Sequence, residues 1–163
     1  MKFSSINELG DFQFHGAVIA DIMLQDSEMV WHISAINTTS QDKQNDYATD
    51  MCIENATMIF ENIQIESLIF SSYQVYDSTN TLIKDVEAKT ISSEEYKEIL
   101  ITPNKNCFTI FAMSAFSKNE DENVYAARFN IDGEKGNFDL TFSFSKTIVE
   151  WKEHFGESGL ERL

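Results

Sequence analysis

Apolar and polar residues alternate strictly along residues 138–145, which read Phe-Asp-Leu-Thr-Phe-Ser-Phe-Ser. Successive side chains of a β-strand point to opposite faces of its sheet, so this segment predicts a strand with one buried and one solvent-facing side. The same period of two recurs along much of the chain. It predicts further strands at residues 17–24, 29–36, 57–70, 73–76 and 124–131, with a break or bulge at Glu61-Asn62.

Short polar segments separate these strands at the spacing of β-hairpins. Residues 25–28 connect two of them, and the glycine-containing segment 132–136 connects two others. Residues 107–116 are apolar on both faces, which is typical of a central strand. We therefore expect residues 107–116, 124–131 and 137–146 to form an antiparallel meander.

One helix is predicted near residues 94–100. Ser92 and Glu95 have the spacing of a capping box, the apolar residues that follow share a helical face, and Pro103 ends it. The tail after residue 148 fits either a second short helix or a continued strand. The polar segment 38–50 predicts a long, mobile loop.

These elements predict a mainly β fold, either an antiparallel sandwich or an open, curved sheet or barrel, with one or two short helices. An α+β roll is the alternative, if the tail and residues 6–9 are helical. The single proline and six glycines leave no room for a flexible linker. We therefore expect one β-rich domain over residues 1–163.

The chain is strongly acidic, with 27 acidic and 12 basic residues and a formal net charge of −15. This balance argues against binding to nucleic acid and to anionic membranes, since both need a basic face. It permits a basic protein partner, a cation or simple solubility. No secretory leader and no apolar run long enough to cross a bilayer is visible, so a cytoplasmic location is expected.

Catalytic, cofactor-binding and metal-binding signatures are missing from the sequence. His15, His32 and His154 lack the close spacing of a zinc site. Cys52 and Cys107 lie in apolar runs and predict two buried, reduced thiols. Neither a serine nucleophile elbow nor a phosphate-binding glycine loop occurs. The sequence therefore favours a non-enzymatic protein without a cofactor.

Two acidic loops are the predicted contact sites for a basic protein partner. Neither has the ligand spacing of a calcium loop, so they are interpreted as solvated loops. Their residues are Asp42, Asp46 and Asp50 in one loop and Glu120, Asp121 and Glu122 in the other.

Three segments resemble parts of small uncharacterised bacterial β-sheet proteins. Phe14-His15-Gly16-Ala17-Val18-Ile19 resembles their opening, residues 58–63 their middle strand and residues 150–156 their closing segment. In the opening segment those proteins often carry an acidic residue where this chain has Gly16. Some of them look like immunity partners encoded beside toxins, and no catalytic residue is carried over from them.

Three functional hypotheses follow. The first is a non-enzymatic, immunity-like interaction protein with an acidic surface. The second is a carrier of a small ligand in an aromatic-lined barrel or sandwich, and the third is an enzyme with an unrecognised site. The sequence leaves the oligomeric state open.

Overall fold

Antiparallel strands dominate the computed structural model, which describes residues 3–40, 45, 47, 49–101 and 107–152. Ten of them form one sheet in the order β1-β15-β7-β4-β3-β12-β13-β14-β8-β11. Its strands are β1 (Phe3–Ile6), β3 (Val18–Gln25), β4 (Glu28–Ser34), β7 (Ala56–Glu61), β8 (Gln64–Phe70), β11 (Lys89–Thr90), β12 (Phe108–Asn119), β13 (Val124–Gly133), β14 (Gly136–Phe144) and β15 (Lys146–Trp151). Because β1 and β11 form two unjoined edges, the sheet is open, and the predicted mainly β, antiparallel fold is confirmed.

Two smaller sheets and short helices complete the described part of the chain. One sheet has the order β2-β5-β6 and the other pairs β10 with β9. Their bounds are β2 (Phe12–Gln13), β5 (Ile36–Thr38), β6 (Met51–Ile53), β9 (Tyr73–Tyr76) and β10 (Leu82–Val86). The helices are α1 (Tyr96–Leu100) and 3-10 turns at Leu9–Asp11 and Ser93–Glu95.

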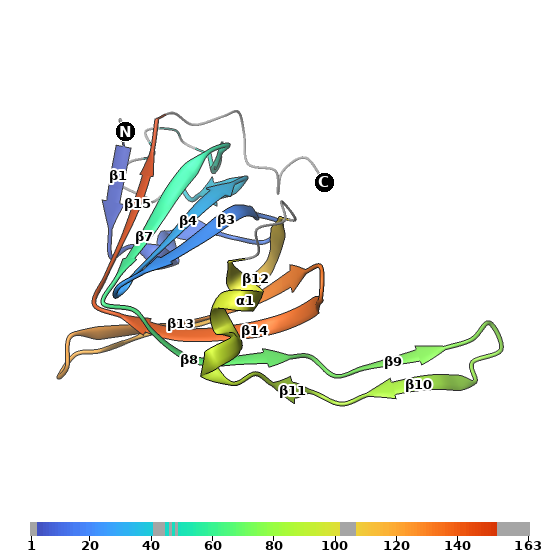
Figure 1. Cartoon of the computed structure of the whole chain (residues 1–163). Helices are drawn as coiled ribbons and strands as arrows, with labels where there is room; N and C mark the ends of the chain where they lie inside the picture. The colour runs from blue at the N-terminus through green and yellow to red at the C-terminus, as the bar shows by residue number, and fades with distance from the viewer. Residues whose placement is uncertain (1–2, 41–44, 46, 48, 102–106, 153–163) are drawn as a thin grey trace.

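The large sheet folds over on itself into two layers. β1, β15, β7, β4 and β3 form one layer, and β13, β14 and β8 lie across it (Figure 1). The chain passes between the layers where β7 leads to β8 and where β14 leads to β15. At this corner Asn62 has a φ of 54° and its Nδ2 donates to Ser145 Oγ at 2.7 Å. The predicted break at Glu61-Asn62 is therefore confirmed as the corner of the sheet.

An aromatic core fills the space between the layers. Trp31 lies at its centre, with ring centroids 5.1 Å from Phe60, 5.0 Å from Phe129 and 5.9 Å from Phe142. These four side chains are fully buried. They come from β4, β7, β13 and β14, so both layers contribute to one cluster. The alternating phenylalanines of the sequence thus form the predicted dry face.

The structure decides three local predictions. The strand predicted at residues 29–36 breaks at Ala35, whose φ is 61°, so that β5 pairs in the small sheet instead. The helix over residues 94–100 is confirmed, but Ser92 makes no side-chain cap hydrogen bond. The tail continues as β15 through Trp151, which removes its helical alternative there. The predicted helix end at Pro103, and Phe155 in the tail, lie outside the described residues.

The predicted meander is confirmed, but β12 is not a central strand along its whole length. It pairs with β13 from Thr109 to Asn119 and with β3 only at Phe108 and Thr109. Two register shifts in β12 bend it away from β3, which leaves Phe111 57% exposed. Cys52 is half-buried and Cys107 is exposed, so the prediction of two buried thiols is wrong for Cys107.

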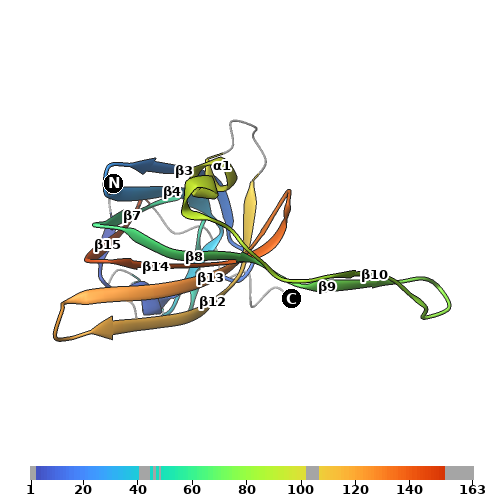
Figure 2. The ribbon, with the colours of Figure 1, turned by 60° about the horizontal axis from the view of Figure 1, so that its bottom comes forward.

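The hairpin of β9 and β10, hereafter the arm, projects away from the two layers (Figures 1 and 2). It continues the pair β8–β11 beyond the edge of the large sheet. Asp77 organises its tip, since Oδ1 accepts hydrogen bonds from Thr79 N at 2.8 Å, Thr79 Oγ1 at 2.7 Å and Thr81 N at 3.0 Å. The Thr79 hydroxyl first, then the Thr81 and Thr79 amides, lower the pKa of Asp77 below its ordinary value.

The position of Asn62 at the corner of the sheet predicts different losses of folding stability for two substitutions of this residue. Asn62→Gly removes the hydrogen bond to Ser145 and destabilises the fold by about 0.5–1.5 kcal/mol. Asn62→Ala removes the same bond and keeps a Cβ in the left-handed region, without the polar side chain that lets asparagine adopt it, so this variant should be roughly 1–2 kcal/mol less stable than Asn62→Gly. Urea unfolding of both variants measures the difference. Equal stabilities of the two variants contradict a role for the positive φ.

The arm tip predicts a pH-dependent turn. Because the folded-state pKa of Asp77 lies below the ordinary value of 3.8, its stabilisation is complete above pH 3.8 and is lost as the pH falls through the lower folded value. The protection factors of the Thr79 and Thr81 amides in hydrogen exchange should therefore fall in acid. Asp77→Asn keeps an acceptor that does not titrate, and should remove this pH dependence. If the protection factors of the wild type and Asp77→Asn depend on pH in the same way, the Asp77 carboxylate is not the group that stabilises the turn.

Candidate functional site

A hollow of about 410 Å³ lies on the outer face of β12, β13, β14 and β8. Its floor is a row of small side chains on neighbouring strands. Ser117 is the cross-strand partner of Ala126, Ala126 of Ser143, and Ser143 of Gln64. Directly opposite residues share a face of a sheet, so these four side chains lie side by side. The surface is hollow here because three adjacent positions carry only serine or alanine.

Polar side chains with two carboxylates surround this floor. Asn62 and Glu66 approach from the corner and from β8, and Asn119 and Glu122 approach from the turn between β12 and β13. Gln64 and Ser145 supply further amide and hydroxyl groups. We name this site, with its floor and rim, the acidic hollow. Its rim brings together two carboxylates that are 56 residues apart in the sequence.

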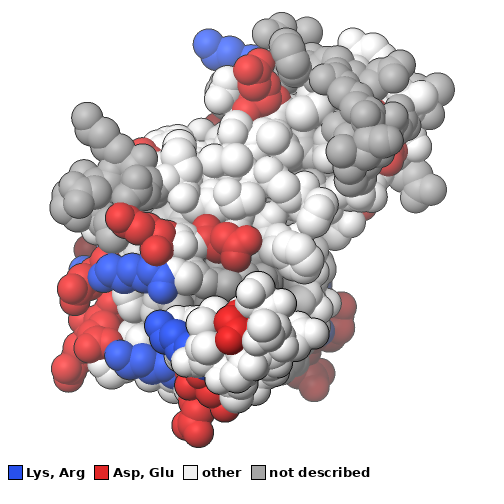
Figure 3. Space-filling model, turned by 90° about the vertical axis from the view of Figure 1, so that its right-hand side faces the viewer, with Lys and Arg blue, Asp and Glu red and all other residues white. Residues whose placement is uncertain are grey.

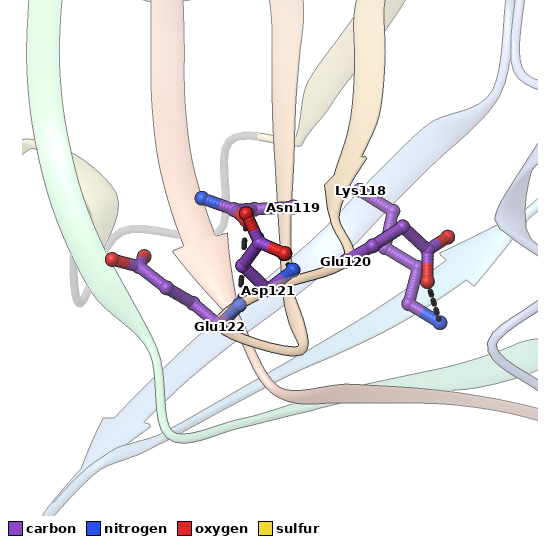
Figure 4. A network of polar contacts seen from close by, with 5 residues as sticks. All are labelled: Lys118, Asn119, Glu120, Asp121 and Glu122. Atoms are coloured by element: carbon purple, nitrogen blue, oxygen red, sulfur yellow. Dashed lines mark hydrogen bonds and ion pairs between the residues drawn. The ribbon is translucent and has the colours of Figure 1, made fainter.

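The turn holds Glu122 by hydrogen bonds to its backbone. Asn119 Oδ1 accepts from the backbone N of Asp121 at 3.1 Å and of Glu122 at 3.3 Å. Such an Asn turn fixes the chain locally without a glycine. Figure 4 shows Glu122 on one side of the turn, and Lys118 with Glu120 on the other. Of the predicted contact residues, the turn therefore directs Glu122 to the hollow and Glu120 away from it.

The basic residues near this turn leave the hollow acidic. Lys118 Nζ lies 3.5 Å from Glu120 and 5.4 Å from the centroid of the Tyr125 ring, on the side facing away from the hollow. Arg128 lies in the next row of β13, where its Nε donates to Thr141 Oγ1 at 3.1 Å. Among the described residues that line the hollow, none is lysine or arginine. Glu66 and Glu122 therefore face it without a basic neighbour in its wall.

The two predicted acidic loops have different outcomes. Glu120, Asp121 and Glu122 form an exposed turn, and of these Glu122 lines the hollow. In the other loop Asp42 and Asp46 lie outside the described residues. Asp50 Oδ1 accepts a hydrogen bond from the backbone N of Ser40 at 2.7 Å, and Asp50 does not line the hollow.

A histidine–carboxylate pair on β3 and β4 escaped the sequence analysis. His32 Nδ1 lies 2.5 Å from Asp21 Oδ1, and the two side chains are 46% and 59% exposed. They are cross-strand partners on the surface of the sheet, which accounts for the hydrogen bond between them. A second hollow of about 220 Å³ beside His32 is lined by Ser34, Thr57 and neighbouring residues. The pair became visible only when the register of β3 and β4 was known.

Metal clusters, membrane helices and known relatives give no further guide to the function. Within the described residues, no group of three or more His, Cys, Asp or Glu side chains is arranged to hold a metal ion. No helix among them is long and apolar enough to span a membrane. No protein-family model, curated protein or solved structure matches the chain. The resemblance to immunity-like bacterial proteins therefore stays a prediction.

The turn geometry predicts a specific effect of Asn119→Ala. The substitution removes the acceptor for two backbone N–H groups, each hydrogen bond being worth about 0.5–1.5 kcal/mol at most on an exposed turn. Hydrogen exchange should accelerate at the amides of Asp121 and Glu122. Ser117→Ala changes the same hollow without touching the turn and should leave both amides as in the wild type. Unchanged exchange in Asn119→Ala contradicts the proposed anchoring.

Proposed function

We propose that this chain is a non-enzymatic, immunity-like interaction protein that binds a basic segment of another protein in the acidic hollow. The observation that carries this proposal is the position of Glu66 and Glu122 around one hollow whose described lining contains no basic residue. A lysine or arginine side chain of a partner can lie on the small-residue floor and donate to these carboxylates. Amide and hydroxyl groups of the rim accept the remaining N–H donors.

The shape and chemistry of the hollow favour a protein segment over other ligands. The hollow is open along the outer face of four strands, as a peptide-sized ligand requires. Its uncharged lining residues are mostly serine and amide side chains that hydrogen-bond readily, and carboxylates repel phosphate groups. The lining of this site therefore supports a cationic peptide segment and disfavours an anionic ligand.

Electrostatic attraction governs how such a partner binds. An exposed ion pair contributes only about 0.2–1 kcal/mol, so two rim carboxylates alone give weak binding. A chain with a net charge of −15 also attracts a basic partner from a distance and accelerates its association. Both contributions weaken when salt screens the charges. We therefore propose a complex whose affinity falls steeply with ionic strength.

The aromatic core gives less support to the carrier hypothesis. Trp31, Phe60, Phe129 and Phe142 are fully buried and pack against one another. An apolar pocket at the edge of the core, beside Phe108, has a volume of about 20 Å³. A pocket of this size has room for about one water molecule.

Neutralising the rim of the hollow predicts weaker partner binding. The wild type, Glu66→Gln/Glu122→Gln and the charge-matched control Glu54→Gln/Glu94→Gln are each immobilised and loaded with lysate of the source organism. Glu54 and Glu94 are exposed and do not line the hollow. A basic protein should be retained by the wild type and the control. Loss of two exposed ion pairs should weaken its binding to the rim variant roughly 2- to 30-fold and lower its elution salt.

The control separates the rim from the general charge of the protein. Elution of the partner at the same salt from all three columns contradicts a role for Glu66 and Glu122. Equal weakening in both double variants assigns the attraction to net charge and overturns the hollow as the site. A wild-type column that retains no basic protein contradicts the interaction hypothesis itself.

A further inference from the structure

We propose that two copies of this chain associate through the outer edge of β9 in the arm, forming a four-stranded antiparallel sheet β10-β9-β9-β10. This goes beyond the proposed function, because the arm and the acidic hollow are separate surfaces. The arm extends from one side of the molecule, and the turn between β12 and β13 projects from the opposite side (Figures 1 and 2). A dimer through the arms therefore leaves both hollows accessible.

The two edges of the arm differ in how they are protected against pairing. Among the described residues, β9 and β10 each have only the other as a neighbour. β10 carries Lys84 and Asp85 and is interrupted by a bulge at Ile83, three features that blunt an edge strand. β9 itself, Tyr-Gln-Val-Tyr over residues 73–76, has no charge, no proline and no bulge. The outer edge of β9 is therefore the one open to a further strand.

The arm also exposes an unusual amount of apolar surface for an acidic protein. Five of its large hydrophobic side chains are exposed, with no layer of the core covering either face of the ribbon. They are Tyr73 at 50%, Val75 at 37%, Tyr76 at 51%, Leu82 at 46% and Ile83 at 63%. An isolated two-stranded ribbon is only marginally stable in water, whereas three or more strands with an apolar face are stable. Pairing with a second copy supplies the missing strands.

A two-fold axis through β9 gives favourable side-chain pairs. Residues that lie directly opposite each other in antiparallel strands point to the same face of the sheet. The two-fold axis must therefore pass beside a residue that lies opposite the same residue of the second copy. With the axis at Val75, Gln74 lies opposite Tyr76 of the second copy. With the axis at Gln74, Tyr73 lies opposite Val75 of the second copy. Both registers pair aromatic or β-branched residues and bring no like charges together.

Charge favours the arm over other surfaces for self-association. Two chains of net charge −15 repel each other, and the arms keep the acidic bodies at opposite ends of the dimer. On the side toward which the arm projects, basic and acidic side chains are interspersed below a broad area with few charges (Figure 3). The remaining repulsion acts at long range and is screened by salt. Salt should therefore strengthen the dimer, whereas it weakens binding to a basic partner.

The size of the contact sets its strength. β9 spans only four residues, or roughly 13 Å at about 3.3 Å per residue. Such a contact buries less than the roughly 800 Å² per partner that stable complexes bury. We therefore expect a reversible dimer that forms at high concentration, in the range of about 10 μM to 1 mM.

Sedimentation velocity over this range of concentration, at low and high salt, tests the proposal with two variants of equal charge. Val75→Glu places the carboxylates of both copies beside the symmetry axis, where they repel each other. Within one arm the new carboxylate lies opposite Lys84, the cross-strand partner of residue 75, so the hairpin itself should stay folded. Ile83→Glu adds the same charge on β10. The wild type and Ile83→Glu should dimerise with rising concentration, more so at high salt, and Val75→Glu should stay monomeric. Circular dichroism checks that both variants fold.

Three results would overturn the proposal. A wild type that is monomeric at about 1 mM in high salt excludes a second copy as the occupant of the edge. Dimerisation of Val75→Glu equal to the wild type excludes β9 as the interface. Loss of the dimer in Ile83→Glu alone assigns the contact to β10. None of these results bears on the acidic hollow, whose test measures a different partner with the opposite salt dependence.

Discussion

Burial of Trp31 between phenylalanines of two layers is the interaction on which the rest of the structure depends. Phe60 reaches it from β7, and Phe129 and Phe142 reach it from β13 and β14. One sheet can enclose such a cluster only by folding over, and it does so at the corner where Asn62 bonds to Ser145. The alternation of strand side chains then leaves every second residue on the outside. Core and candidate site are thus opposite faces of the same strands.

This division explains where the functional surfaces lie. Phe142 and Phe144 of β14 point into the core, so Ser143 between them belongs to the floor of the acidic hollow. Side chains alternate between two faces in the arm as well, but there neither face is buried. Its strands run beyond the second layer, and both of their faces are exposed. A face that the core does not cover is free to bind another molecule.

Sequence periodicity predicted the strands well where local pattern decides the structure. Residues 57–70 and 124–131 became β7, β8 and β13 nearly as expected, including the break at Glu61-Asn62. Prediction failed where the structure depends on a single backbone angle, as at Ala35, or on pairing with distant strands, as in the bulged β12. The acidic hollow shows the same limit. Glu122 was a sequence candidate, but Glu66 joins it only because β8 pairs with β14, a long-range pairing that no local pattern contains.

The central claim is that the acidic hollow binds a basic protein segment. Amide NMR of the protein, titrated with a short peptide rich in lysine and arginine at low salt, tests it most directly. The account predicts that resonance shifts concentrate at Glu66, Asn119, Glu122 and Ser143, and that added salt reverses them. Shifts confined to other surfaces, or spread evenly over all acidic residues, would contradict it.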